Sequence, residues 1–174
     1  MLKLFINTWG NYNENGACGG RWITLPMDED ELEEVLENIA RGMGDNDPEF
    51  CIHDFEWEGG YDFHEISEMD NIYDLNEECE KLDNMYDWEL KTYCAACECF
   101  GKKYVDIDDL DDFVLHEDIQ DNYDLGYYWA VESGCYDLEK MGSLANYIDY
   151  GAFGRDINFE ADGGFTSFGF VERV

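Results

Sequence analysis

The chain opens with apolar and polar residues in alternation, which is the pattern of a half-buried β-strand. Leu2, Leu4 and Ile6 share one face of this stretch. An Asn- and Gly-rich segment follows, and the next segment, RWITL at residues 21–25, is rich in β-branched and aromatic side chains and ends at Pro26. The pattern predicts a β-hairpin in which the Asn/Gly-rich segment makes the turn.

An amphipathic helix is predicted next. Asp28 and Glu31 have the spacing of a capping box, and Gly42 or Gly44 ends the helix. Apolar residues recur at the helical spacing i, i+3, i+4 and i+7: Leu32, Val35, Leu36 and Ile39.

A third strand is predicted within EFCIHDFEWEG, residues 49–59, with Phe50, Ile52 and Phe55 facing inward. Together with the hairpin and the helix it would form a small N-terminal α/β module, residues 1–60.

Steps of three and four separate the apolar residues from Ile72 to Phe100, which is helical spacing. A break at residues 84–87 divides the stretch into two helices, with Asp87 capping the second and FGKK closing it. This region, residues 61–103, is predicted to be a central helical module.

The remaining residues, 104–174, are predicted to form a C-terminal α/β module. Its first part is a charged helical region around Leu110, Phe113 and Val114. A helix is expected at about 144–153 and strands at about 156–160 and 165–171. The turn between these strands is assigned to Asp162, Gly163 and Gly164.

Composition favours a folded protein, because 45% of the residues are hydrophobic and 16% are aromatic. The N-terminal segment alternates too much for a signal peptide, and no apolar run approaches the roughly 20 residues of a membrane span. Seven cysteines, an odd number without a regular framework, fit reduced thiols. We therefore expect a protein of the cytoplasm, without contact to a membrane.

Negative charge is the most unusual feature of the composition. The formal net charge is −33, and residues 28–124 hold 34 acidic against 5 basic residues, whereas the first 27 residues hold one acid and two bases. Within DEDELEEVLE, Glu29 repels Glu33 and Glu33 repels Glu37, each pair costing roughly 0.2–0.5 kcal/mol. Such a chain would repel nucleic acid, and it indicates a cationic partner, bound cations or high salt.

Three explanations can account for the negative charge. A halophilic surface should be acidic over the whole exterior, whereas the first 27 residues carry a net positive charge. Nonspecific buffering of cations would not need a rigid, aromatic-rich core. The third is imitation of a nucleic-acid duplex for a basic cleft. Duplex DNA carries one charge per roughly 1.7 Å, so 33 charges cover about 56 Å, more than the diameter of about 40 Å of a compact globule of this length. Mimicry thus predicts an elongated molecule of small modules laid end to end, and a homodimer would roughly double the imitated length. Together with the elements above, the expected fold class is α+β, an elongated chain of three small modules.

Cysteine spacing in CAACEC, which holds Cys94, Cys97 and Cys99, is reminiscent of zinc sites. On a helix Cys99 points away from the other two, and no second pair follows, so small buried hydrophobic side chains are the preferred interpretation.

Signals for catalytic histidines and for a calcium site are equally weak. His53, His64 and His116 stand apart from any nucleophile or HExxH-type partner, which favours structural roles. Asp106, Asp108 and Glu117 fall at three EF-hand positions, but the residues at the fifth and turn-glycine positions do not fit. No cofactor, no metal and no enzymatic activity are expected.

Several segments resemble the ArdA antirestriction proteins of conjugative elements and phages: GRWITLP, CIHDFEW, YDLNEECEKL, and above all LANYIDYGAFGRD with the closing GGFTSFGFVERV. The resemblance extends nearly from end to end. It implies a DNA mimic that occupies the DNA-binding groove of type I restriction-modification enzymes in the bacterial cytoplasm. It further implies three modules, a homodimer joined through the C-terminal one, and an antirestriction segment that we place between Glu132 and Asp156.

Phosphate-mimicking acids are expected in three rows: Asp28, Glu29, Asp30, Glu33, Glu34 and Glu37; Asp70, Asp74, Glu77, Glu78 and Glu80; and Asp106, Asp108, Asp109, Asp111, Asp112, Glu117, Asp118 and Asp121. The dimer or antirestriction segment comprises Tyr147, Ile148, Asp149, Tyr150, Phe153, Arg155 and Asp156. Its apolar members could instead belong to the core. The alternative function is an acidic interaction module for another basic DNA-binding protein.

Overall fold

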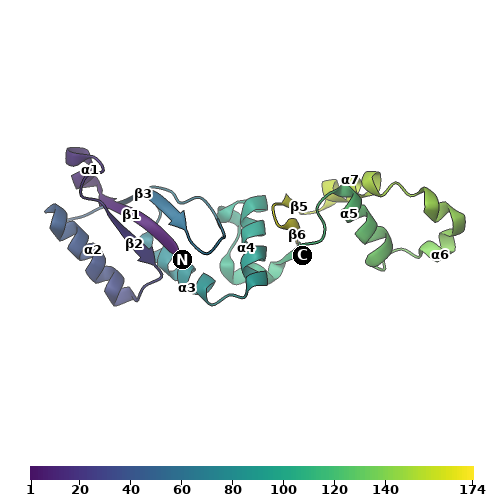
Figure 1. The fold of residues 1–174 in the computed structure, drawn as a ribbon, viewed down its shortest axis with the longest axis horizontal. Helices are drawn as coiled ribbons and strands as arrows, with labels where there is room; N and C mark the ends of the chain where they lie inside the picture. The colour runs from purple at the N-terminus through teal and green to yellow at the C-terminus, as the bar shows by residue number, and fades with distance from the viewer. The chain divides into compact units, whose positions relative to one another are not determined.

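The computed structural model describes all of residues 1–174, which form two compact units, Met1–Tyr86 and Asp87–Val174. Each unit contains one three-stranded antiparallel sheet with helices (Figure 1). The predicted α+β class is therefore confirmed. The division into three modules stays a prediction. No helix combines the length and apolar character that crossing a membrane requires.

In the first unit the sheet order is β2-β1-β3, with β1 at Leu2–Thr8, β2 at Arg21–Leu25 and β3 at Phe50–Trp57. The pairing of β1 with β2 confirms the predicted hairpin strands, and Leu2 lies opposite Leu25. Leu2, Leu4, Ile6 and Leu25 are fully buried and form the centre of this core.

The connection between these strands is not the simple turn that the sequence predicted, because it contains the helix α1, Trp9–Asn15. The Thr8 side chain accepts a hydrogen bond from the Asn11 backbone N–H and caps this helix. The buried Asn7 bonds both the Asn11 side chain, at 2.8 Å, and the Gly16 carbonyl, at 3.1 Å. These amide contacts account for a helix in a segment rich in turn-forming residues.

Strand β3 is confirmed, but its predicted inward-facing residues are only partly right. The register shifts between Phe5 and Ile6, so that Phe5 pairs with Asp54 and Ile6 with Ile52. Such a bulge interrupts the alternation of faces. Cys51 and Ile52 are both buried as a result, whereas Phe50 and Phe55 are half-buried.

Two helices complete the first unit. Helix α2, Glu29–Met43, begins after the capping residue Asp28 and ends at Gly44 in the left-handed conformation. It buries Leu32, Leu36, Ile39 and Ala40, close to the predicted stripe. Helix α3, Ile72–Asp83, packs against β2, and its Asn76 side chain bonds both the backbone N–H and the carbonyl of Met27 at 2.9 Å.

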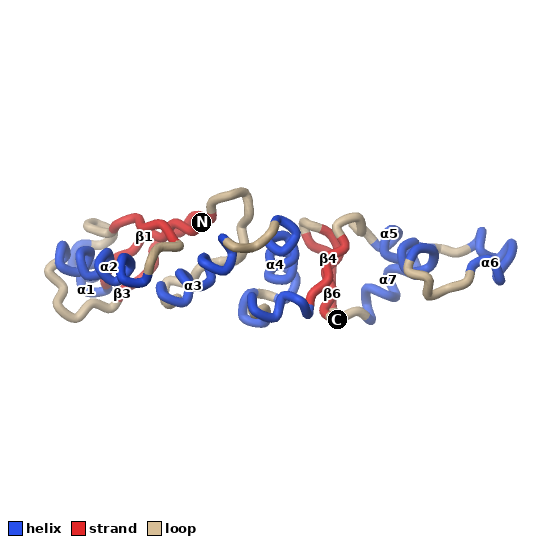
Figure 2. Tube along the Cα trace, turned by 90° about the horizontal axis from the view of Figure 1, so that it is seen from below, coloured by secondary structure: helices blue, strands red, loops and turns tan.

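The second unit begins with helix α4, Asp87–Phe100, which confirms the predicted break after α3. Helix α4 packs on a sheet of order β4-β6-β5, with β4 at Phe113–His116, β5 at Gly163–Thr166 and β6 at Gly169–Arg173 (Figure 2). Short helical turns, η1 at Lys102–Tyr104 and η2 at Ile107–Asp112, lead from α4 to β4.

Between β4 and β5 the chain is mostly helical. It forms α5 at Asn122–Tyr127, the π-turn η3 at Tyr128–Glu132, α6 at Leu138–Met141, the 3₁₀ turn η4 at Gly142–Tyr147 and α7 at Tyr150–Glu160.

Three sequence predictions are wrong in this unit. Phe113 and Val114 lie in β4 and not in a helix, because they pair with Arg173 and Glu172 of β6. Residues 156–160 belong to α7 and not to a strand. The turn between β5 and β6 is at Ser167 and Phe168, while Gly163 and Gly164 are paired inside β5.

Candidate acidic interface

Helix α2 presents the first predicted acidic row to solvent. All six of its predicted acids are exposed: Asp28, Glu29, Asp30, Glu33, Glu34 and Glu37. The acids of the first turn are favoured by the positive end of the helix dipole, which offsets part of their mutual repulsion. Farther along, Arg41 lies 3.5 Å from Glu37. Helix capping and the buried stripe therefore fix a face on which carboxylates far outnumber cations.

On α3 the second predicted row is only partly at the surface. Asp74, Glu77 and Glu80 are exposed, and Asp70 is half-buried where its carboxylate accepts the Ser67 N–H at 2.7 Å. Glu78 points inward instead, with 8% of its surface exposed and its carboxylate 2.9 Å from His64 Nε2. The structure thus places Glu78 apart from the exposed acids, and its carboxylate is not available to a partner protein.

In the second unit all eight acids of the third row are exposed: Asp106, Asp108, Asp109, Asp111, Asp112, Glu117, Asp118 and Asp121. Asp106 caps η2 and Asp121 caps α5. Lys91 Nζ lies 2.8 Å from Glu117 and 3.3 Å from Asp87, and these contacts raise the pKa of Lys91, chiefly through the hydrogen bond to Glu117. Some of these carboxylates thus also stabilise local structure.

Helices α5 and α7 cross at two glycines. A Cβ on Gly126 would stand 1.9 Å from the Tyr150 carbonyl oxygen, and a Cβ on Gly154 would stand 1.8 Å from the Asn122 carbonyl oxygen. Backbone therefore packs directly on backbone at this crossing, which only glycine permits.

The predicted dimer or antirestriction segment lies on and before α7. Tyr147 is 84% exposed, and Arg155 and Asp156 are also exposed, so these three residues are not core. Ile148, Tyr150 and Phe153 are half-buried, and Asp149 caps α7 by accepting the Ala152 N–H at 3.0 Å. The Tyr150 ring packs edge-on against Tyr123 and Tyr127, and the Phe153 ring against Tyr136.

A Cys–His–Glu arrangement in the first unit was not foreseen. Cys51 Sγ lies 3.4 Å from His53 Nε2, and Glu68 lies 3.8 Å from His53 Nδ1. The thiol is buried and donates to the Asn7 carbonyl, and burial raises its pKa. A nucleophile needs the exposed thiolate, so this arrangement favours a structural role. The other two histidines also contact carboxylates, His64 with Glu78 and His116 with Glu172 at 3.0 Å.

Comparison with known families decides the identity of the chain. The family model described as "Antirestriction protein (ArdA)" matches residues 4–172, nearly the whole chain. The chain belongs to the ArdA antirestriction protein family. No curated protein is detectably similar to it. The match extends over both units, so the three acidic rows and the predicted dimer or antirestriction segment all lie within the region that the family model covers.

Sequence reasoning missed several exposed acids of this ArdA protein. Asp54 and Glu56 stand on the outer face of β3, and Asp83 ends α3. The alternation in HDFEWE was the available signal, because acids two residues apart in a strand share a face. These residues enlarge the negative surface of the first unit.

The seven thiols of this ArdA protein should differ sharply in reactivity. Cys18 and Cys135 are exposed, Cys99 is half-buried, and Cys51, Cys79, Cys94 and Cys97 are buried. Burial raises the pKa of Cys99, and it raises the pKa of Cys79 to about 12. We expect two thiols to react rapidly with Ellman's reagent at pH 8, and all seven after unfolding in guanidinium. Rapid modification of Cys79 in the native protein, detected by peptide mass spectrometry, would contradict the described packing.

Proposed function

We propose that this protein is a DNA mimic that binds the DNA-binding groove of type I restriction-modification enzymes and competitively blocks the binding of DNA. The proposal starts from the antirestriction family and adds a mechanism and a target. It requires no cofactor and no catalytic residue. It also predicts an elongated arrangement of the modules.

One observation carries the proposal: rigid secondary structure presents many carboxylates with few neighbouring cations. Of the 19 acids predicted to imitate phosphates, Glu78 is buried and Asp70 half-buried, and the others are exposed. Asp and Glu side chains ordinarily carry a full negative charge at pH 7. Mutual repulsion of the charges on such a surface opposes folding. The surface is best explained if its negative electrostatic potential serves to attract a cationic partner.

The mechanism follows from the way proteins hold DNA. A basic groove binds duplex largely through phosphates, and binding releases the counterions condensed on the DNA. Carboxylates on α2, on α3 and around η2 can neutralise the same lysine and arginine side chains. Because the attraction is spread over many groups, no single carboxylate should be indispensable.

A displacement titration tests this proposal. Purified protein is added to a type I restriction-modification enzyme bound to its fluorescently labelled recognition duplex, and DNA release is followed by anisotropy. We expect complete release at a stoichiometric ratio, and we expect higher salt to weaken the binding of the inhibitor. Retention of DNA at a large excess of folded protein would contradict the proposed target.

The alternative is an acidic module that binds another basic DNA-binding protein, such as a nucleoid protein or a repressor. It rests on the same carboxylates, since a negative field suits many basic grooves. The family membership favours the restriction enzyme. The same titration with a nucleoid protein in place of the enzyme distinguishes the two.

Homodimer formation through the C-terminal segment is part of the proposal. The exposed Tyr147 and the half-buried rings of Tyr150 and Phe153 supply apolar surface near Arg155, in a region where acids are sparser than in the rows. Two copies of so acidic a chain would repel each other least there. We place both the dimer and its target in the cytoplasm of the bacterial host.

A further inference from the structure

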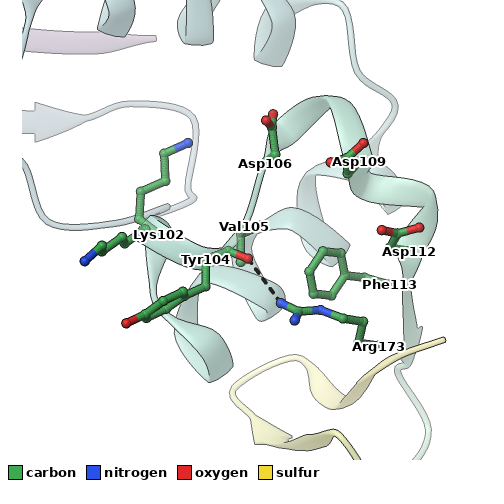
Figure 3. A pocket seen from close by; sticks show the side chains of 9 residues that line it. Lys102, Tyr104, Val105, Asp106, Asp109, Asp112, Phe113 and Arg173 are labelled. Carbon is green, nitrogen blue, oxygen red and sulfur yellow. Dashed lines mark hydrogen bonds between the residues drawn. The ribbon is translucent and has the colours of Figure 1, made fainter.

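Positive charge gathers at one pocket of the second unit. Lys102, Lys103 and Arg173 line a cavity of about 480 Å³ (Figure 3). The whole chain has only ten lysine and arginine residues, so three of them lie at this one place. The two lysines come from η1 and Arg173 from β6, which are far apart in the sequence.

Aromatic groups hold these cations in place. The Arg173 guanidinium lies 4.8 Å from the ring centre of Phe100 and 5.0 Å from that of Phe113, and its Nη2 donates to the Tyr104 carbonyl at 3.1 Å. Lys103 Nζ lies 5.7 Å from the centre of the Tyr104 ring and has no carboxylate partner. By contrast, Lys140 is 2.7 Å from Asp137. Lys103 therefore remains available to an external anion.

The same pocket also has an acidic side. Figure 3 shows Asp106, Asp109 and Asp112 along the side away from Lys102, with Arg173 extending toward Tyr104. A pocket with opposite charges on two sides suits a protein surface that carries an acidic and a basic group close together. A free anion fits less well, because the net charge of −33 repels it from the whole molecule.

Resting on the function proposed above, we infer that this pocket receives an acidic side chain of the restriction enzyme, beside its basic groove. Rows of carboxylates alone would not fix one position of the inhibitor in the groove, since proteins that contact only phosphates can slide along DNA. One positive position within a negative surface removes this ambiguity, because a wrong placement would set Lys103 against a basic side chain. The lysine thus fixes the orientation of the inhibitor.

Charge reversal at Lys103 tests this inference, because binding by net negative charge alone and a contact with an acidic side chain predict effects of opposite direction. Lys103→Glu makes the chain more negative by two charges, and Arg21→Glu makes the same change at an exposed position of β2, outside the pocket, the acidic rows and the antirestriction segment. If only the overall field mattered, both variants would bind a basic groove as well as the wild type or better. If Lys103 contacts an acidic side chain, Lys103→Glu should weaken displacement of the labelled duplex by about tenfold, while Arg21→Glu should not weaken it.

Lys103 is exposed, so the substitution should leave the fold intact, which circular dichroism checks. Lys103→Gln should fall between the wild type and Lys103→Glu. Equal displacement by Lys103→Glu and Arg21→Glu, with the wild type active, would overturn this inference alone. A wild-type protein that displaces no DNA would overturn the proposed function together with it.

Discussion

Replacing Gly154 by alanine is expected to destabilise the second unit by about 3 kcal/mol or more. The new Cβ would stand 1.8 Å from the Asn122 carbonyl and 2.6 Å from the Gly126 backbone nitrogen, so α5 and α7 would have to separate. Both atoms belong to the backbone and cannot move aside as a flexible side chain would. Thermal unfolding followed by near-ultraviolet circular dichroism would report the loss through the surrounding tyrosines.

Gly151→Ala is the matched control, because it makes the same change in the same helix. Its Cβ would meet no atom closer than 3.6 Å, from Asp149 Oδ1. Alanine favours a helix over glycine by roughly 0.5–1 kcal/mol, so stability should stay equal or rise. A Gly154→Ala variant as stable as Gly151→Ala would contradict the described crossing.

Neutralising the acidic face of α2 is expected to reduce antirestriction strongly. The variant changes five exposed acids to their amides and keeps the capping residue Asp28: Glu29, Asp30, Glu33, Glu34 and Glu37. If each carboxylate contributes about 0.5 kcal/mol to binding, the combined loss is about 2.5 kcal/mol, or roughly 70-fold in affinity. Each single substitution should cost only about two- to threefold. Competition against labelled duplex on a type I enzyme measures both.

A charge-conserving variant controls for the number of substitutions. Exchanging aspartate for glutamate and glutamate for aspartate at the same five positions keeps the field, and inhibition should persist. The distributed mechanism would be wrong if one amide substitution, such as Asp30→Asn, abolished inhibition, or if the fivefold neutral variant inhibited as well as the wild type.

Elements defined by local signals could be predicted from the sequence. Helix α2 has its capping residue, its apolar stripe and its terminal glycine within one segment, and the break between α3 and α4 is marked by Asn and Asp. Surface acids on these helices followed from the same periodicity. Such features depend on neighbours within a few residues, so no knowledge of the tertiary fold was needed.

Elements that depend on distant partners could not be predicted. Strand β4 forms because β6, more than fifty residues later, pairs with it, and residues 156–160 stay helical because α7 packs on α5 through Gly154. Glu78 fits the surface pattern of α3, but His64 from a preceding loop draws it inward. The pocket at Lys103 needs Arg173, which only the fold brings near.

The central claim is that carboxylates replace DNA phosphates, and the salt dependence of binding tests it most directly. The dissociation constant of the protein and a type I enzyme is measured by calorimetry or anisotropy at several salt concentrations, beside that of the enzyme and its DNA. Phosphate-like contacts predict a steep linear fall of log affinity with log salt, with a slope of the same order as for DNA. A slope near zero, with tight binding, would show that apolar contacts and not imitation of a duplex hold the complex.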